Sequence, residues 1–66
     1  MKFAKLRGLI KEKGMTEAEL ANKINLSASS LSCRLGGKVD WTLPEMRAVC
    51  DVLEINFSEI GKYFFN

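Results

Sequence analysis

One stretch of the sequence, residues 16–38, constrains the fold more than any other: TEAELANKINLSASSLSCRLGGK. Thr16 and Glu19 have the S/T-x-x-E spacing of a capping box, in which each side chain accepts a hydrogen bond from the other residue's backbone N–H group. Asn25 follows, and asparagine tolerates the positive φ that a tight chain reversal needs. Ser27 can then cap a second helix. The stretch therefore predicts a helix, a tight turn and a second helix.

The apolar residues of this stretch fall on one side of each expected helix. Leu20 and Ile24 are four residues apart in the first helix, and Leu31 and Leu35 repeat that spacing in the second. Side chains at i and i+4 lie on the same helical face, so each helix presents one stripe to be buried. Two glycines at positions 36 and 37 are expected to end the second helix.

The opposite face of the second helix carries small side chains, those of Ala28, Ser29, Ser32 and Cys33. Serine and cysteine rank below alanine, lysine and glutamate in helix propensity, so propensity does not explain them. Small side chains allow close approach, which a helix needs when it enters a DNA groove about 12 Å wide. The alternative is a short solvated helix whose serines are incidental. Composition alone leaves both interpretations open.

The stretch and its surroundings resemble the helix-turn-helix of the Cro and C1 repressor superfamily. The resemblance is carried by residues 15–21, 24–27, 31–32 and 37–38, with matching spacing throughout. The runs LSCRLGGKVDWT and IGKYFF look like the recognition-helix exit and the C-terminal ending of small phage-encoded Cro-like regulators. The resemblance covers about residues 3–65. It implies an all-α, compact five-helix domain of the lambda-repressor-like fold, with the motif at the second and third helices.

The resemblance also implies which residues meet DNA. Those facing base edges would be Ala28, Ser29, Ser32, Cys33 and Arg34. Those contacting phosphates would be Thr16, Glu17, Lys23, Ser27, Ser30 and Lys38. Family members usually carry a phosphate-binding glutamine where this sequence has Glu17. For Arg34, a base edge, a phosphate and plain solvent all remain open.

Many family members pair an arginine near the end of the first helix with a glutamate at the end of the recognition helix. The matching positions here are Ile10 and Leu35, and both are apolar. Replacing a buried ion pair by packed hydrophobic residues is energetically reasonable. We therefore expect an ordinary packing contact at this place.

Composition excludes several classes of site. The 66 residues contain two cysteines and no histidine, which rules out a disulfide framework and the usual zinc fingers, so no metal or other cofactor is expected. Without histidine or paired carboxylates, an enzyme is not expected either. Cys33 and Cys50 are interpreted as free thiols in a reducing cytoplasm. No run approaches the roughly 18 apolar residues of a membrane span, and the N-terminus lacks a signal core.

The net charge of +2 is unevenly distributed along the chain. Residues 1–38 hold eight lysines or arginines against three acids, whereas residues 39–66 hold two against five. A basic half that contains the expected motif, with an acidic half elsewhere, is the polarity expected of a small DNA-binding protein. Chance clustering in so short a chain is the alternative.

The remaining sequence predicts three more helices and a single domain over residues 1–66. A first helix is expected at residues 2–13, ended by Gly14, and a short last helix at 57–61, capped by Asn56. Thr42 and Glu45 form a second capping box that opens a fourth helix, whose core face is Met46, Val49, Cys50 and Leu53. Trp41 is expected to cover the core, with a place beside the DNA-facing edge as the alternative.

Three consecutive aromatic residues close the chain, Tyr63, Phe64 and Phe65. They are too apolar to be left in water, so they either fold back on the core or meet a second subunit, and we expect at least one to support dimerisation. The leading hypothesis is a phage or prophage Cro-like repressor. Its partners would be a double-stranded DNA operator and a second copy on that DNA, with neither a membrane nor a small-molecule ligand, and it would reside with the nucleoid in a bacterial cytoplasm. The alternative is a protein-interaction module of the same fold, an antirepressor or antitoxin-like partner acting through the aromatic tail.

Overall fold

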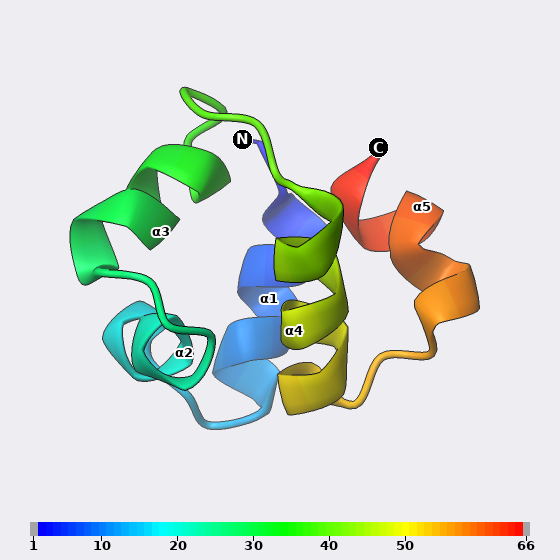
Figure 1. Cartoon of the computed structure of the whole chain (residues 1–66). Coiled ribbons are helices and arrows are strands. Elements are labelled where there is room, and N and C mark those ends of the chain that lie inside the picture. Colours follow the sequence, from blue (N-terminus) through cyan, green and yellow to red (C-terminus); the bar gives the residue numbers. More distant parts are fainter. Residues whose placement is uncertain (1, 66) are drawn as a thin grey trace.

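The computed structural model describes residues 2–65, which form α-helices and no strand. Five α-helices and one 3₁₀ turn follow in order: α1 (Ala4–Glu12), α2 (Glu17–Lys23), α3 (Ala28–Leu35), α4 (Leu43–Leu53), η1 (Phe57–Glu59) and α5 (Ile60–Phe64). In Figure 1, α2 and α3 lie on one flank of α4 and α5 lies on the other. The all-α prediction is confirmed. None of these helices is long and apolar enough to cross a membrane.

Both predicted capping boxes are present. Thr16 Oγ1 accepts a hydrogen bond from Glu19 N–H, and Glu19 Oε1 accepts one from Thr16 N–H. Thr42 and Glu45 repeat this exchange at the start of α4. These bonds satisfy N–H groups that have no partner within the helix, so they fix where α2 and α4 begin.

A tight turn joins α2 to α3. Asn25 has a φ of 62°, in the left-handed region that the sequence predicts for it. The N–H group of Leu26 donates to the carbonyl oxygen of Ala21 at 2.8 Å, which closes the turn. Ile24 is buried at the end of α2, and Leu26 packs in part against the core. The turn therefore holds the two short helices against each other.

One hydrophobic core lies between the helices. Its members come from α1 to α5 and from the short connections between them, and include every apolar position that the helical spacing predicts to be buried in α2, α3 and α4. The buried residues are Leu6, Ile10, Leu20, Ala21, Ile24, Leu31, Leu35, Met46, Val49, Cys50, Leu53, Ile55 and Phe64. Both Ile10 and Leu35 are in this set, and the direct packing contact expected between them stays a prediction.

The first helix begins later than predicted. It starts at Ala4 because Phe3 adopts a left-handed conformation with a φ of 56°, which a helix cannot include. The Phe3 ring instead lies edge-on to Trp41, with the ring centroids 6.2 Å apart. Trp41 in turn packs against the core, which confirms its expected role as a cover. Contact between the two rings thus sets the start of α1.

The last helix also differs from the prediction of a single helix at residues 57–61. A 3₁₀ turn, η1, comes first and is capped by Asn56 Oδ1, which accepts from Ser58 N–H at 3.1 Å. The α-helix α5 then continues to Phe64, beyond the predicted end. Phe64 is buried edge-on against Trp41 with the ring centroids 5.1 Å apart, so a tertiary contact extends the helix.

Candidate nucleic-acid interface

The exposed face of α3 is built from small side chains over a buried stripe. Leu31 and Leu35 are both fully buried, and they fix the rotation of the helix about its axis. Ala28, Ser29 and Ser32 are exposed, while Cys33 is half-buried. We call these last four residues the small face. Its side chains leave the backbone of α3 open to close approach by a partner.

A cluster of hydroxyl groups forms the start of α3. Ser27 Oγ accepts from Ser30 N–H at 3.1 Å and shares a second hydrogen bond with Ser30 Oγ at 2.9 Å. Ser29 Oγ lies 3.3 Å from Ser27 Oγ. Ser27 and Ser29 are exposed, so both hydroxyls remain within reach of a partner. The first turn of α3 therefore offers several donors and acceptors in a fixed arrangement.

Arg34 lies on α3 but faces α4. Its Nε donates to Glu45 Oε1 at 2.9 Å, and its Nη2 lies 2.8 Å from Glu45 Oε2. Its Nη1 donates to the carbonyl oxygen of Ser30 at 3.0 Å. The guanidinium holds the pKa of the Glu45 carboxyl below its ordinary value, because it donates a hydrogen bond to the ionised form. Arg34 is thus neither a plain solvated arginine nor a free group beside the small face.

The predicted phosphate-contacting residues do not share one environment. Thr16, Lys23, Ser27 and Lys38 are exposed, Ser30 is half-buried, and Thr16 also caps α2. Glu17 forms an ion pair in which Arg7 Nη1 donates to Glu17 Oε2 at 3.2 Å. The start of α2 therefore presents a paired carboxylate and guanidinium.

Lys2 and Arg7 are basic residues whose contacts with the α2–α3 segment were not predicted from the sequence. Besides Glu17, the Arg7 side chain reaches the carbonyl oxygen of Lys2 at 3.4 Å. The Lys2 side chain lies against Gly37, close enough that a Cβ atom at position 37 would overlap it. Arg7 of α1 thus reaches the start of α2, and Lys2, just before α1, reaches the glycine that follows α3. No local spacing reveals these contacts, because they depend on how α1 crosses the other helices.

The three tail aromatics have different surroundings. Phe64 is buried in the core, Tyr63 is half-buried against it, and Phe65 is 68% exposed. Any contact with a second subunit would therefore rest on Phe65, with a smaller share from Tyr63.

One family model covers the whole chain. It is described as Protein of unknown function (DUF739), and it matches residues 1–66. The chain belongs to this family. No curated protein shows significant similarity to the chain.

The chemistry available to this DUF739 protein is that of a polar surface. The half-buried Cys33 lies on the small face, whereas burial raises the pKa of the Cys50 thiol within the core. The small face can donate and accept hydrogen bonds and can touch a methyl group. The exposed Lys2, Lys23 and Lys38 can neutralise anionic groups nearby, whereas Arg7 is already paired with Glu17.

Proposed function

We propose that this DUF739 protein is a sequence-specific, double-stranded DNA-binding transcriptional regulator of the Cro and C1 type. In this proposal α2 and α3 form the helix-turn-helix of a lambda-repressor-like fold, and α3 enters the major groove. The observation that carries the proposal is the small face of α3, exposed opposite the fully buried Leu31 and Leu35. A solvated helix has no need of such a surface.

The small face has the chemistry of base-edge recognition. The hydroxyl groups of Ser29 and Ser32 donate and accept hydrogen bonds, so they suit any base pair in the major groove. The methyl group of Ala28 suits the C5-methyl group of thymine. None of these side chains keeps the helix backbone away from the bases.

The distribution of charge supports the same proposal. The residues up to Lys38 carry an excess of positive charge, and those after it carry an excess of negative charge. The exposed Lys23 and Lys38 would meet phosphates beside α3. Contacts to phosphates position a protein on DNA without reading the sequence, and they make affinity depend on salt.

A titration of a fluorescent random-sequence duplex tests whether the protein binds DNA. We expect binding at low salt that weakens steeply as salt rises, because each neutralised phosphate releases counterions and makes the slope of log K against log salt concentration more negative by about 0.9. Lack of detectable binding at roughly 50 mM salt would contradict the proposal, since non-specific binding is electrostatic.

The exposed Phe65 favours a second candidate function, a protein-interaction module that binds another regulator. Such a module would not bind the random duplex, and its partner would be lost when Phe65 is replaced by serine. The titration therefore separates the two candidates before any partner is known.

A further inference from the structure

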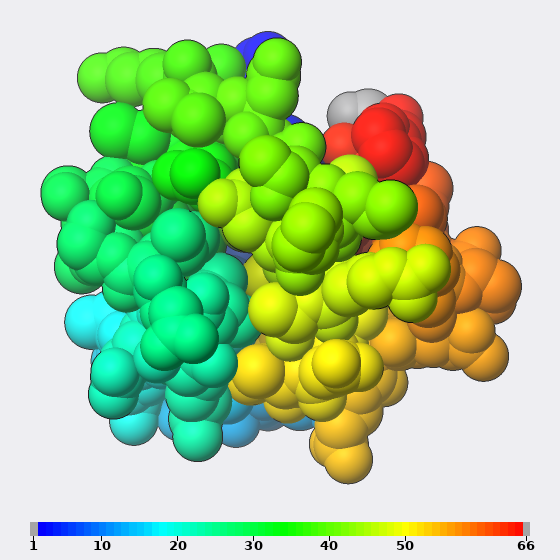
Figure 2. All heavy atoms as spheres, in the orientation of Figure 1, coloured from blue at the N-terminus to red at the C-terminus, as the bar shows by residue number. Residues whose placement is uncertain are grey.

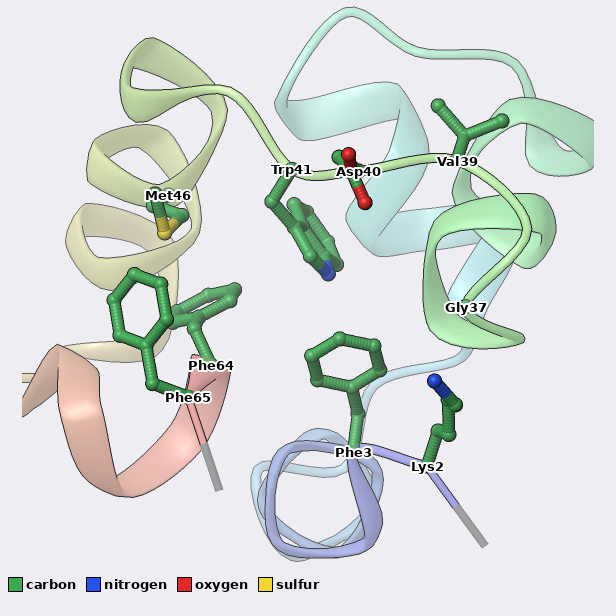
Figure 3. Close-up of a pocket in the computed structure, with 9 residues that line it drawn as sticks. All are labelled: Lys2, Phe3, Gly37, Val39, Asp40, Trp41, Met46, Phe64 and Phe65. Atoms are coloured by element: carbon green, nitrogen blue, oxygen red, sulfur yellow. The ribbon is translucent and has the colours of Figure 1, made fainter.

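One hollow in the surface lies beside the C-terminal tail. Figure 3 shows the rings of Phe3, Trp41 and Phe64 turned toward one another in it, and its volume is about 370 Å³. Its walls include Phe65, the residue on which any contact with a second subunit would rest. This hollow therefore belongs to the role already expected for the tail.

A larger hollow, of about 590 Å³, lies between α1 and the start of α2, and we call it the α1 groove. Ala4, Gly8 and Lys11 line it from α1, and all three are exposed. Their spacing of four and three residues places them on one face of the helix, over two turns. In Figure 2 the blue atoms of α1 are mostly hidden behind later segments of the chain, so most of the exposed surface of α1 lies on another side of the molecule.

The floor of the α1 groove is aliphatic. Ile10 is buried beneath it, and Met15 contributes a half-buried side chain from the connection between α1 and α2. None of the described residues that line the groove is aromatic. A Cβ atom at Gly8 would meet nothing within 4 Å, so the groove is open above the backbone of α1. Such a floor suits a flexible hydrocarbon chain better than a flat ring, which prefers aromatic neighbours.

The charged residues of the α1 groove leave one positive charge uncompensated. Arg7 and Glu17 line it as an ion pair, so their charges offset each other. Lys11 takes part in no ion pair among residues 2–65. Binding sites for small molecules typically combine an apolar lining with a few polar groups that fix the orientation of the ligand. Here the single free cation selects an anionic group.

The length of the groove along α1 limits the size of its ligand. Lys11 follows Ala4 by seven residues, which is about 10 Å along the axis of an α-helix. With carbon–carbon bonds of about 1.5 Å, an extended chain of about eight carbons together with its carboxylate covers this length.

We propose that the α1 groove binds an aliphatic carboxylate of this length, with its chain over Ala4 and Gly8 and its carboxylate beside Lys11. None of these three residues is assigned to the candidate nucleic-acid interface, so binding in the groove does not depend on DNA binding. The sequence predicts no small-molecule ligand, because the groove arises only where α1 packs against the start of α2.

Titration of the isotope-labelled full-length chain with octanoate, followed by the chemical shifts of its backbone amides, tests this binding. We expect saturable shifts at Ala4, Gly8, Lys11 and Met15, with a dissociation constant of about 1 mM or below. Octanol has the same chain without the carboxylate, so it should bind at least about threefold more weakly. Acetate has the carboxylate without the chain, so it should cause no saturable shift.

Two substitutions, each with a matched control, test the two parts of the site. A leucine side chain in Gly8→Leu would fill the groove and should weaken octanoate binding at least about tenfold. Gly61→Leu makes the same change in α5, where a Cβ atom also meets nothing within 4 Å, and should leave binding within about twofold of the wild-type value. Lys11→Glu reverses the charge and should weaken binding at least about threefold. Lys5→Glu, at an exposed position of α1 outside the groove, is its control.

Absence of saturable shifts at millimolar octanoate would overturn the proposal. Shifts confined to Trp41 and Phe65 would overturn it too, because the acid would then occupy the hollow beside the tail. Undiminished binding by a folded Gly8→Leu variant would exclude the α1 groove. If the melting curve shows that Gly8→Leu is unfolded, the comparison of Lys11→Glu with Lys5→Glu decides, and equal binding by these two variants would contradict the site. DNA binding by a chain that binds no octanoate would leave the proposed function intact.

Discussion

Arg34 and Glu45 form a two-pronged ion pair that ties α3 to α4. Two guanidinium nitrogens meet the two carboxylate oxygens at 2.9 and 2.8 Å, and each side chain is 16% exposed. Glu45 also closes the capping box of α4 with Thr42, so the pair is anchored in the first turn of that helix. The planar guanidinium fits a carboxylate in a fixed orientation. The angle of α3 relative to α4 is therefore held by a specific contact as well as by the core.

We predict that Arg34 positions α3 and does not read bases. Glu45→Gln would release Arg34 and weaken the hold on α3, so it should lower DNA affinity by a similar factor for every operator variant and lower the melting temperature by a few degrees. A base-reading Arg34 would give another pattern: Glu45→Gln would leave affinity unchanged or raise it, and Arg34→Ala would abolish the preference at one base pair. Titrations against a set of single-base operator variants distinguish the two patterns.

The ion pair between Arg34 and Glu45 predicts that the folded protein loses stability in acid. The pKa of Glu45 is lowered in the folded protein, chiefly by the hydrogen bond from Arg34, so the folded state binds the proton more weakly than the unfolded state. The resulting stabilisation is complete above the ordinary carboxyl pKa of about 4.3 and is lost as the pH falls through the lowered pKa. Thermal melts across this range should show a smaller acid-dependent decrease for Glu45→Gln than for the wild-type chain. Equal decreases would show that other carboxylates dominate.

A negative charge on the small face should abolish DNA binding without unfolding the protein. Ser29 and Ser32 are exposed, so replacing either by glutamate changes stability by only about 0.5 kcal/mol or less. In the groove, however, the new carboxylate would face phosphates and base acceptors. Gel-shift titrations of Ser29→Glu and Ser32→Glu check this, and Ser58→Glu in η1 supplies an exposed control that should bind normally. If both variants on α3 bind as tightly as the control, α3 is not the reading helix.

Replacing glycine by alanine should have opposite effects on stability at positions 8 and 37. A Cβ atom at Gly8 would meet nothing within 4 Å, and α1 continues through this residue. Gly8→Ala should therefore stabilise the protein by about 0.4–1 kcal/mol, by restricting the unfolded chain. At Gly37 the φ is 80° and the Lys2 side chain fills the space, so Gly37→Ala should destabilise it. Urea unfolding of both variants measures whether each substitution raises or lowers the free energy of unfolding. If Gly8→Ala destabilises the protein, another part of the chain must lie close to Gly8.

Much of the fold was predictable because its signals are local. The caps at Thr16, Ser27 and Thr42, the left-handed Asn25 and the apolar spacing of α2, α3 and α4 each depend on residues within one or two helical turns. The predicted start of α1 and the predicted bounds of the last helix were wrong. Ring contacts between Phe3, Trp41 and Phe64 override the local helical preference at these places. Tertiary contacts of this kind leave no regular spacing in a sequence.

The candidate site shows the same division. The exposure of Ala28, Ser29 and Ser32 follows from the helical period that buries Leu31 and Leu35. The pairing of Arg34 with Glu45 was not predicted, because Glu45 was assigned only to the capping box. The ion pair between Glu17 and Arg7, ten positions earlier, was not predicted either, because it depends on how α1 packs against α2.

Selection of bound duplexes from a random pool tests most directly whether α3 reads DNA. The full-length chain should enrich a short sequence, repeated as an inverted pair about one helical turn apart if two copies bind together. The same selection with Ser29→Glu should enrich nothing. Enrichment of no sequence by the wild-type chain, at salt concentrations where it binds the random duplex, would show that the protein binds DNA without reading it and would contradict the role assigned to the small face.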